Sequence, residues 1–102
     1  MTARYVLSPE AANDLVGIWR YIGAQASFET ADHVEAAILE RILFLAGAPG
    51  VGHWRRDLTE YPVKFFPVYS YLIVYLPDTM PLQVVSILHG HRDVERILRA
   101  RL

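Results

Sequence analysis

The stretch from Val63 to Asp93 constrains the fold of this chain more than any other. Three runs rich in β-branched and aromatic residues follow one another within it: Val63–Val68, Tyr71–Leu76 and Leu82–His89. This composition predicts strands, and the connections at 69–70 and 77–81 contain the turn residues serine, proline and aspartate. Connections this short join antiparallel neighbours. The sequence therefore predicts a three-stranded antiparallel meander.

The second and third of these strands are apolar almost without alternation, at 71–76 and 84–88. Strands of this kind are covered on both faces of their sheet. One face therefore requires helices from this chain, and the other is a candidate for covering by a partner. The hydrophobic content of 53% fits either an apolar surface kept for a partner or a well-filled core.

Two helices are predicted between a short strand at Arg4–Leu7 and the meander. Ser8-Pro9-Glu10 is typical of a helix start, because serine caps a free amide, proline at the first position loses no hydrogen bond, and glutamate faces the positive end of the dipole. We expect this helix to end between Gly23 and Ser27. A second helix, capped by Ser27, should run to Gly47.

Helical spacing of apolar residues predicts which face of the hairpin is buried. In the first helix the apolar stripe places Trp19 near the middle of the covered sheet face, whereas the residues off the stripe should face water or a partner: Asn13, Asp14, Gly17 and Arg20.

A third helix, Val94 to Arg101, should follow the meander with Asp93 as its cap. Its arginines Arg96, Arg99 and Arg101 lie near the negative end of the helix dipole. The expected architecture is an α+β fold in one domain over residues 1–102. It comprises an N-terminal strand, an α-helical hairpin, a three-stranded antiparallel meander joined by the first strand, and a short C-terminal helix.

Composition excludes several classes of protein. Ten basic and eleven acidic residues give a net charge of −1, a poor match to a protein that binds mainly by neutralising phosphates. The absence of cysteine excludes disulfides and thiolate metal sites and fits a reducing compartment. No signal peptide is recognisable, and no run approaches the ~18 apolar residues of a membrane span. We expect a soluble, cytoplasmic protein without a cofactor or a membrane partner.

The irregular segment 50–61 holds a cluster of aromatic and cationic residues. Trp54, Arg55 and Arg56 are candidates for nucleic-acid contact, because an aromatic ring between cations can stack on a base. The alternative, which we favour, is that Trp54 seals the edge of the core while Arg56 and Asp57 pair or stay solvated.

A second cluster of charged and titratable residues surrounds the end of the last strand. An alternative is that Lys64, His89, His91 and Arg92 gather at one end of the sheet, since histidines beside cations suit acid–base chemistry near neutral pH. Two histidines without a third ligand make a poor metal site, so no metal is expected. The reading we prefer is structural, with Arg92 tethered to an acidic or carbonyl partner and Asp93 capping the last helix.

Several motifs together resemble the ParE/RelE toxin superfamily of type II toxin-antitoxin systems. They occur in order along the chain as Leu7–Ala11, Asp14-Leu15, Ile18–Ile22, Arg56–Leu58, Tyr71–Tyr75 and Leu88–Asp93. The resemblance implies a RelE/ParE-like fold and a toxin that a cognate antitoxin neutralises. Within the superfamily, RelE-like members resemble ribosome-dependent mRNA endonucleases and ParE-like members resemble inhibitors of DNA gyrase.

Residue chemistry favours the ParE-like branch. RelE-like toxins supply an arginine just after the first tyrosine of the Tyr-x-x-x-Tyr strand, and here that position is Leu72. Leucine neither holds a phosphate nor donates a proton, so the main electrostatic contribution to RNA cleavage is missing.

The preferred function is therefore a growth-arresting gyrase inhibitor that acts by binding and has no catalytic site of its own. Its partners would be a cognate antitoxin and DNA gyrase, with operator DNA contacted only through the antitoxin. Candidate target contacts are His91, Arg92, Arg96 and Arg99. Two alternatives remain open: an mRNA endonuclease using Lys64, His89, His91 and Arg92, and a non-toxic module that only binds an antitoxin.

Overall fold

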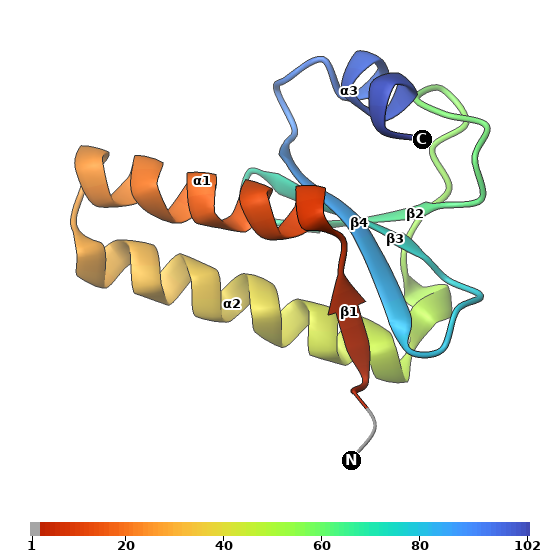
Figure 1. Ribbon diagram of the computed structural model, residues 1–102, viewed down its shortest axis with the longest axis horizontal. Coiled ribbons are helices and arrows are strands. Elements are labelled where there is room, and N and C mark those ends of the chain that lie inside the picture. The colour runs from red at the N-terminus through yellow and green to blue at the C-terminus, as the bar shows by residue number, and fades with distance from the viewer. Residues whose placement is uncertain (1–2) are drawn as a thin grey trace.

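The elements occur in the predicted order. The computed structural model describes residues 3–102, in which a strand, a helical hairpin, three successive strands and a last helix form an α+β fold (Figure 1). The elements are β1 (Tyr5–Leu7), α1 (Pro9–Gln25), α2 (Phe28–Gly47), a 3-10 turn η1 (Pro49–Val51), β2 (Lys64–Val68), β3 (Tyr71–Leu76), β4 (Leu82–His89) and α3 (Val94–Arg101). The predicted fold class and the three strands of the meander are confirmed, to within one residue.

The four strands form one sheet in the order β1-β4-β3-β2. β2, β3 and β4 are antiparallel neighbours, and β1 pairs in parallel with the first half of β4, from Tyr5↔Leu82 to Leu7↔Val84. Parallel neighbours need a crossover connection, which the helical hairpin and the first two meander strands supply. The predicted pairing of the first strand with a later one is therefore confirmed.

The helix starts agree with the predicted caps, and α1 ends within the predicted range of Gly23 to Ser27. Ser8 Oγ accepts a hydrogen bond from Ala11 N at 3.0 Å, and Ser27 Oγ accepts one from Thr30 N at 3.0 Å. Within that range the helix passes through Gly23 and ends at Gln25. A Cβ at Gly23 would lie 2.7 Å from the Phe28 ring. Gly23 therefore lets the two helices approach each other and does not break the first one.

The prediction that Trp19 lies near the middle of the sheet is wrong. Its ring stacks on Phe28 at 5.0 Å, and its indole N–H donates to Asp32 at 2.7 Å. Phe28 begins α2, next to the connection between the helices, and Figure 1 shows that connection lying well away from the strands. Trp19 therefore joins the two helices to each other, and smaller aliphatic side chains fill the space above the sheet.

Each face of the sheet carries its own core. The helical hairpin covers one face with a cluster that includes Leu15, Ile38, Ile42, Ile73 and Ile87. On the opposite face the buried cluster is Val63, Phe65, Val74, Leu88, Val94 and Leu98. The second face was expected to be a candidate for a partner, but α3 and the segment before β2 already bury its centre. No helix within residues 3–102 is long and apolar enough to cross a membrane.

A buried tyrosine fastens the loop after α2 to the sheet. Tyr75 is fully buried, and its hydroxyl donates to Pro49 O at 2.8 Å and accepts from Gly52 N at 2.9 Å. A Cβ at Gly52 would overlap this hydroxyl and lie 2.9 Å from the ring. Only glycine therefore allows the loop backbone to come this close.

We expect stability to fall at alkaline pH through Tyr75. Burial raises the pKa of its phenol above the usual 10.0, and the hydrogen bond from Gly52 opposes this in part. Because the folded-state pKa exceeds the unfolded one, the stabilisation is complete below pH of about 10 and is lost as pH rises through the folded value. Urea unfolding should show that the free energy of unfolding falls between about pH 8 and pH 11, and that it falls less in Tyr75→Phe. An equal loss in that variant would contradict this assignment.

Candidate binding surface at the end of the sheet

The turn between β4 and α3 presents a histidine and an arginine to solvent. β4 ends at His89, which pairs with Tyr71 at the start of β3. Gly90 N then donates to Ser70 O at 2.8 Å, and Arg92 N donates to His89 O at 3.0 Å. His91 and Arg92 are consequently exposed. Asp93 accepts from Arg96 N at 3.1 Å, which confirms it as the cap of α3.

Aromatic rings are packed together at this turn. Tyr71 meets His89 edge to face at 5.4 Å, and His89 lies 5.1 Å from His91. His91 N also donates to His89 Nδ1 at 3.2 Å, so this nitrogen is held as an acceptor. The three rings therefore form one ordered cluster at the end of the sheet.

A groove of about 520 Å³ separates this cluster from α1. The groove is lined from the helix by Asn13, Asp14, Gly17, Ile18 and Tyr21, and from the sheet and the turn by Tyr71, Ile87, His89 and Arg92. Burial raises the pKa of the Tyr71 phenol, with a smaller contribution from the nearby Tyr21. The groove is thus largely apolar and aromatic, with one cation at its rim.

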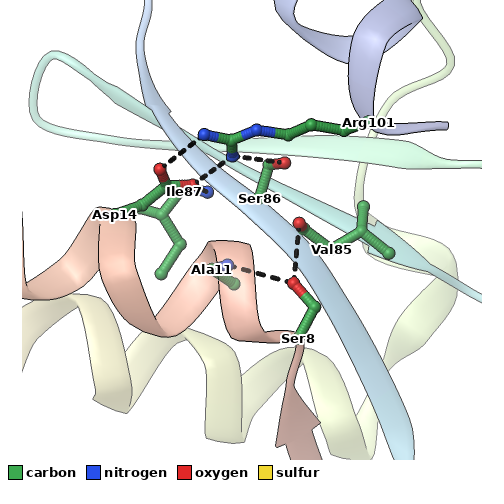
Figure 2. Close-up of polar contacts among 7 residues, drawn as sticks. All are labelled: Ser8, Ala11, Asp14, Val85, Ser86, Ile87 and Arg101. Carbon is green, nitrogen blue, oxygen red and sulfur yellow. Dashed lines mark hydrogen bonds and ion pairs between the residues drawn. The ribbon is translucent and has the colours of Figure 1, made fainter.

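Asp14, which also lines the groove, forms an ion pair that joins α1 to α3 across β4 (Figure 2). Asp14 accepts two hydrogen bonds from Arg101, of 2.6 and 3.0 Å, and Arg101 also donates to the buried Ser86 Oγ at 3.0 Å. The pair is only slightly exposed, at 10% for Asp14 and 24% for Arg101. The hydrogen bond to Asp14 raises the pKa of Arg101, against the opposing effect of burial.

The start of α1 also completes the hydrogen bonding of β4. β1 ends opposite Val84, where Ser8 N donates to Val84 O at 2.9 Å. Beyond this point Ser8 Oγ donates to Val85 O at 2.9 Å, and Asp14 Oδ2 accepts from Ile87 N at 2.9 Å (Figure 2). Two polar side chains thus replace the missing strand at the open edge of β4.

The arginines of α3 differ in their surroundings. Arg99 pairs with Glu95 at 2.9 Å on the exposed side of the helix. Arg96 has no ion-pair partner among residues 3–102, and together with Arg92 it lines a second hollow of about 500 Å³ beside Ile97 and Ala100. The candidate target contacts His91, Arg92, Arg96 and Arg99 therefore lie at one end of the molecule, with Arg92 shared by both hollows.

Comparison with known families identifies the protein. Residues 5–94 match the family model described as the ParE toxin of the type II toxin-antitoxin system parDE. The chain belongs to the ParE toxin family. This match covers the strand, the hairpin and the meander, and it confirms the ParE/RelE resemblance drawn from the motifs.

Solved structures support the fold of this ParE-family protein. One similar chain is from the chromosomal ParDE toxin-antitoxin system of P. aeruginosa, with a TM-score of 0.70 and 19% identity. The alignment covers 83% of this chain and 92% of that one. No curated protein sequence matches this chain at a significant level.

In this ParE-family protein, the four residues named for the alternative ribonuclease site do not lie together. His89, His91 and Arg92 are neighbours, but Lys64 pairs with Tyr75, four positions along β3 from the partner of His89. At about 3.3 Å per residue, this separation is about 13 Å along the strand. Lys64 instead donates to Gly50 O at 3.0 Å. The ribonuclease alternative requires all four residues at one end of the sheet, and they do not gather there.

The expected tether of Arg92 is also wrong. Its side chain has no hydrogen-bond or ion-pair partner in the part of the chain that the structure describes, 3–102. No group of three or more His, Asp or Glu side chains in the same range is placed to hold a metal ion.

The segment around Trp54 is occupied by contacts within the chain. Arg56 and Lys64 each lie 4.9 Å from the centroid of the Trp54 ring. Arg55, not Arg56, pairs with Asp57 at 2.7 Å; this exposed hydrogen bond raises the pKa of Arg55 and lowers that of Asp57. Trp54 remains 44% exposed, so it only partly seals the core edge. The proposed nucleic-acid contacts of Trp54, Arg55 and Arg56 remain a prediction.

The sequence did not predict the Asp14–Arg101 ion pair, nor that residues of α1 and of the sheet would together line a groove. Asp14 was expected to face water or a partner, and Arg101 was assigned to the helix dipole. No local pattern joins residues 87 positions apart. The one signal in the sequence was that Asn13, Asp14 and Gly17 lie off the apolar stripe of α1 and were expected to face water or a partner, and all three line the groove.

Proposed function

We propose that this ParE-family protein arrests growth by binding DNA gyrase, and that a cognate antitoxin neutralises it. The main support is the family match over residues 5–94, and the similar solved chain comes from a ParDE system. The separation of Lys64 from His89, together with Leu72 in place of an arginine, argues for binding over RNA cleavage.

An antitoxin would contact the exposed apolar side chains of the helical hairpin. Large side chains on α1 and α2 remain exposed at Val16, Tyr21, Phe28, Leu43 and Phe44. Exposed apolar side chains on a helical hairpin are candidates for protein–protein contact, and disordered partners bury apolar area as they fold. Operator DNA would be reached only through the antitoxin. A cytoplasmic location would follow from a gyrase target.

Controlled expression in a bacterial host tests the target. Growth arrest with filamentation and a DNA-damage response, while translation continues, is the expected result. Purified protein added to gyrase and supercoiled plasmid should increase cleaved DNA. Immediate arrest of translation with intact DNA would instead favour the endonuclease, and unaffected growth would favour the non-toxic module.

We expect His89→Ala and His91→Ala each to weaken growth arrest by less than about tenfold. A lost contact weakens binding in part, whereas a lost acid–base group lowers the rate of a catalysed step by about 10²–10⁴-fold. The measurement is the inducer concentration needed for half-maximal arrest, with variant levels checked in the presence of antitoxin. Complete loss of toxicity in a folded single variant would argue for catalysis.

A further inference from the structure

Gly17 has no structural role that the fold explains. It lies in the interior of α1, where glycine is the poorest helix former after proline. Gly23 and Gly52 each have a neighbour that a side chain would strike, whereas a Cβ at Gly17 would meet nothing within 4 Å. The helix could therefore carry a larger residue here at no steric cost. The bare backbone at Gly17 instead keeps one wall of the groove open.

The surroundings of the groove favour an occupant that is both apolar and acidic. Ile18, Tyr21 and Ile87 supply apolar walls. The carboxylates that line the groove and the adjoining hollow are already used within the chain: Asp14 holds Arg101 and Ile87 N, and Asp93 caps α3.

Two arginines beside the groove, in contrast, form no ion pairs within the described chain. Arg92 and Arg96 are exposed and have no ion-pair partner within residues 3–102. A surface with paired carboxylates and unpaired arginines complements a negatively charged ligand. Because the protein as a whole carries a charge of −1, a short acidic segment matches this local patch better than a long nucleic-acid backbone does.

We infer that the groove takes an apolar side chain from an acidic peptide segment of the poisoned target, packed against the backbone at Gly17, while Arg92 and Arg96 bind the carboxylates of that segment. This inference rests on the proposed function, because it supplies the contact by which the protein holds gyrase. The apolar anchor gives affinity through burial, and the arginines give orientation and speed of association.

Filling the groove separates this role from a structural one. Gly17→Leu places a side chain in the open space, and because leucine favours helices, thermal stability should be maintained or raised. The protein concentration giving half-maximal gyrase cleavage of supercoiled plasmid should rise at least about tenfold, whereas Gly17→Ala, which adds one methyl, should have a smaller effect. The double variant Arg92→Glu/Arg96→Glu should also raise this half-maximal concentration at least about tenfold. Arg41→Glu reverses one exposed arginine on α2, away from the groove. It is the control for charge reversal elsewhere on the surface and should change this concentration less than about twofold.

The outcomes separate the two proposals. If the unmodified protein leaves gyrase unaffected, the proposed function fails and this inference fails with it. If the unmodified protein poisons gyrase and both variants remain as potent while folded, this inference alone is overturned. It is also overturned if Gly17→Leu loses only antitoxin binding. A last outcome is that the unmodified protein binds plasmid in the absence of gyrase and that the double charge reversal abolishes this binding. That result would assign the surface to DNA and would also overturn the inference.

Discussion

Replacing Asp14 with alanine is expected to lower the free energy of unfolding by about 3 kcal/mol. The change leaves the Ile87 amide without its acceptor and the Arg101 guanidinium without its carboxylate, so that only Ser86 Oγ still accepts from Arg101. Asp14 accepts from both Arg101 and Ile87 N, in a position only 10% exposed. Urea denaturation measures the change. The matched control is Asp57→Ala, whose partner Arg55 lies on the surface, and its effect should stay within about 0.5 kcal/mol.

A double-mutant cycle with Arg101→Ala isolates the ion pair from the amide contact. Asp14 and Arg101 should show a coupling energy of about 1–3 kcal/mol, since they are in direct contact. Hydrogen exchange should accelerate at the amides of α3 in either single variant, because the helix loses its connection to α1. Additive effects, with unchanged exchange in α3, would contradict the assignment.

The second large effect is expected at Gly52. Gly52→Ala should lower the free energy of unfolding by about 2–4 kcal/mol, because its methyl would overlap the Tyr75 hydroxyl and force the loop away from the sheet. Combining Gly52→Ala with Tyr75→Phe should recover part of the lost stability, because the hydroxyl is removed. The recovery is partial because the methyl would still lie 2.9 Å from carbon atoms of the ring. The measurement is the urea midpoint of the four proteins.

Gly50→Ala provides the control in the same loop. Nothing lies within 4 Å of a Cβ at Gly50, so its effect should stay within about 0.5 kcal/mol. Equal losses at Gly50 and Gly52 would show that backbone freedom in the loop matters and that contact with Tyr75 does not.

Features set by neighbouring residues were predictable from the sequence. Ser8, Ser27 and Asp93 cap their helices as expected, because capping needs only a side-chain oxygen and an amide three residues away. The strand bounds were predictable for the same reason, since composition and turn residues are local signals.

Features that depend on packing were not predictable in this way. Glycine at position 23 suits a helix end and equally suits close contact with the Phe28 ring. Only the position of that ring shows which role applies. The partner of Asp14 comes from the far end of the fold. The groove likewise needs residues from α1, β3 and β4 at once.

The misplacement of Lys64 has a different origin. In an antiparallel meander, the start of the first strand and the end of the third lie at opposite ends of the sheet. Strand order alone therefore separates Lys64 from His89, and the error was one of topology that the predicted fold already contained.

The parallel pairing of β1 with β4 also affects how the molecule forms during its synthesis. Ser8 bonds to a strand residue 77 positions later, so β1 and the start of α1 have no sheet partner until β4 has been made. At a translation rate of about 5–20 residues per second, the interval between the synthesis of Ser8 and that of its partner in β4 is about 4–15 s. Each newly made molecule therefore passes through a period in which the hairpin exists without the surface that β4 and α3 complete.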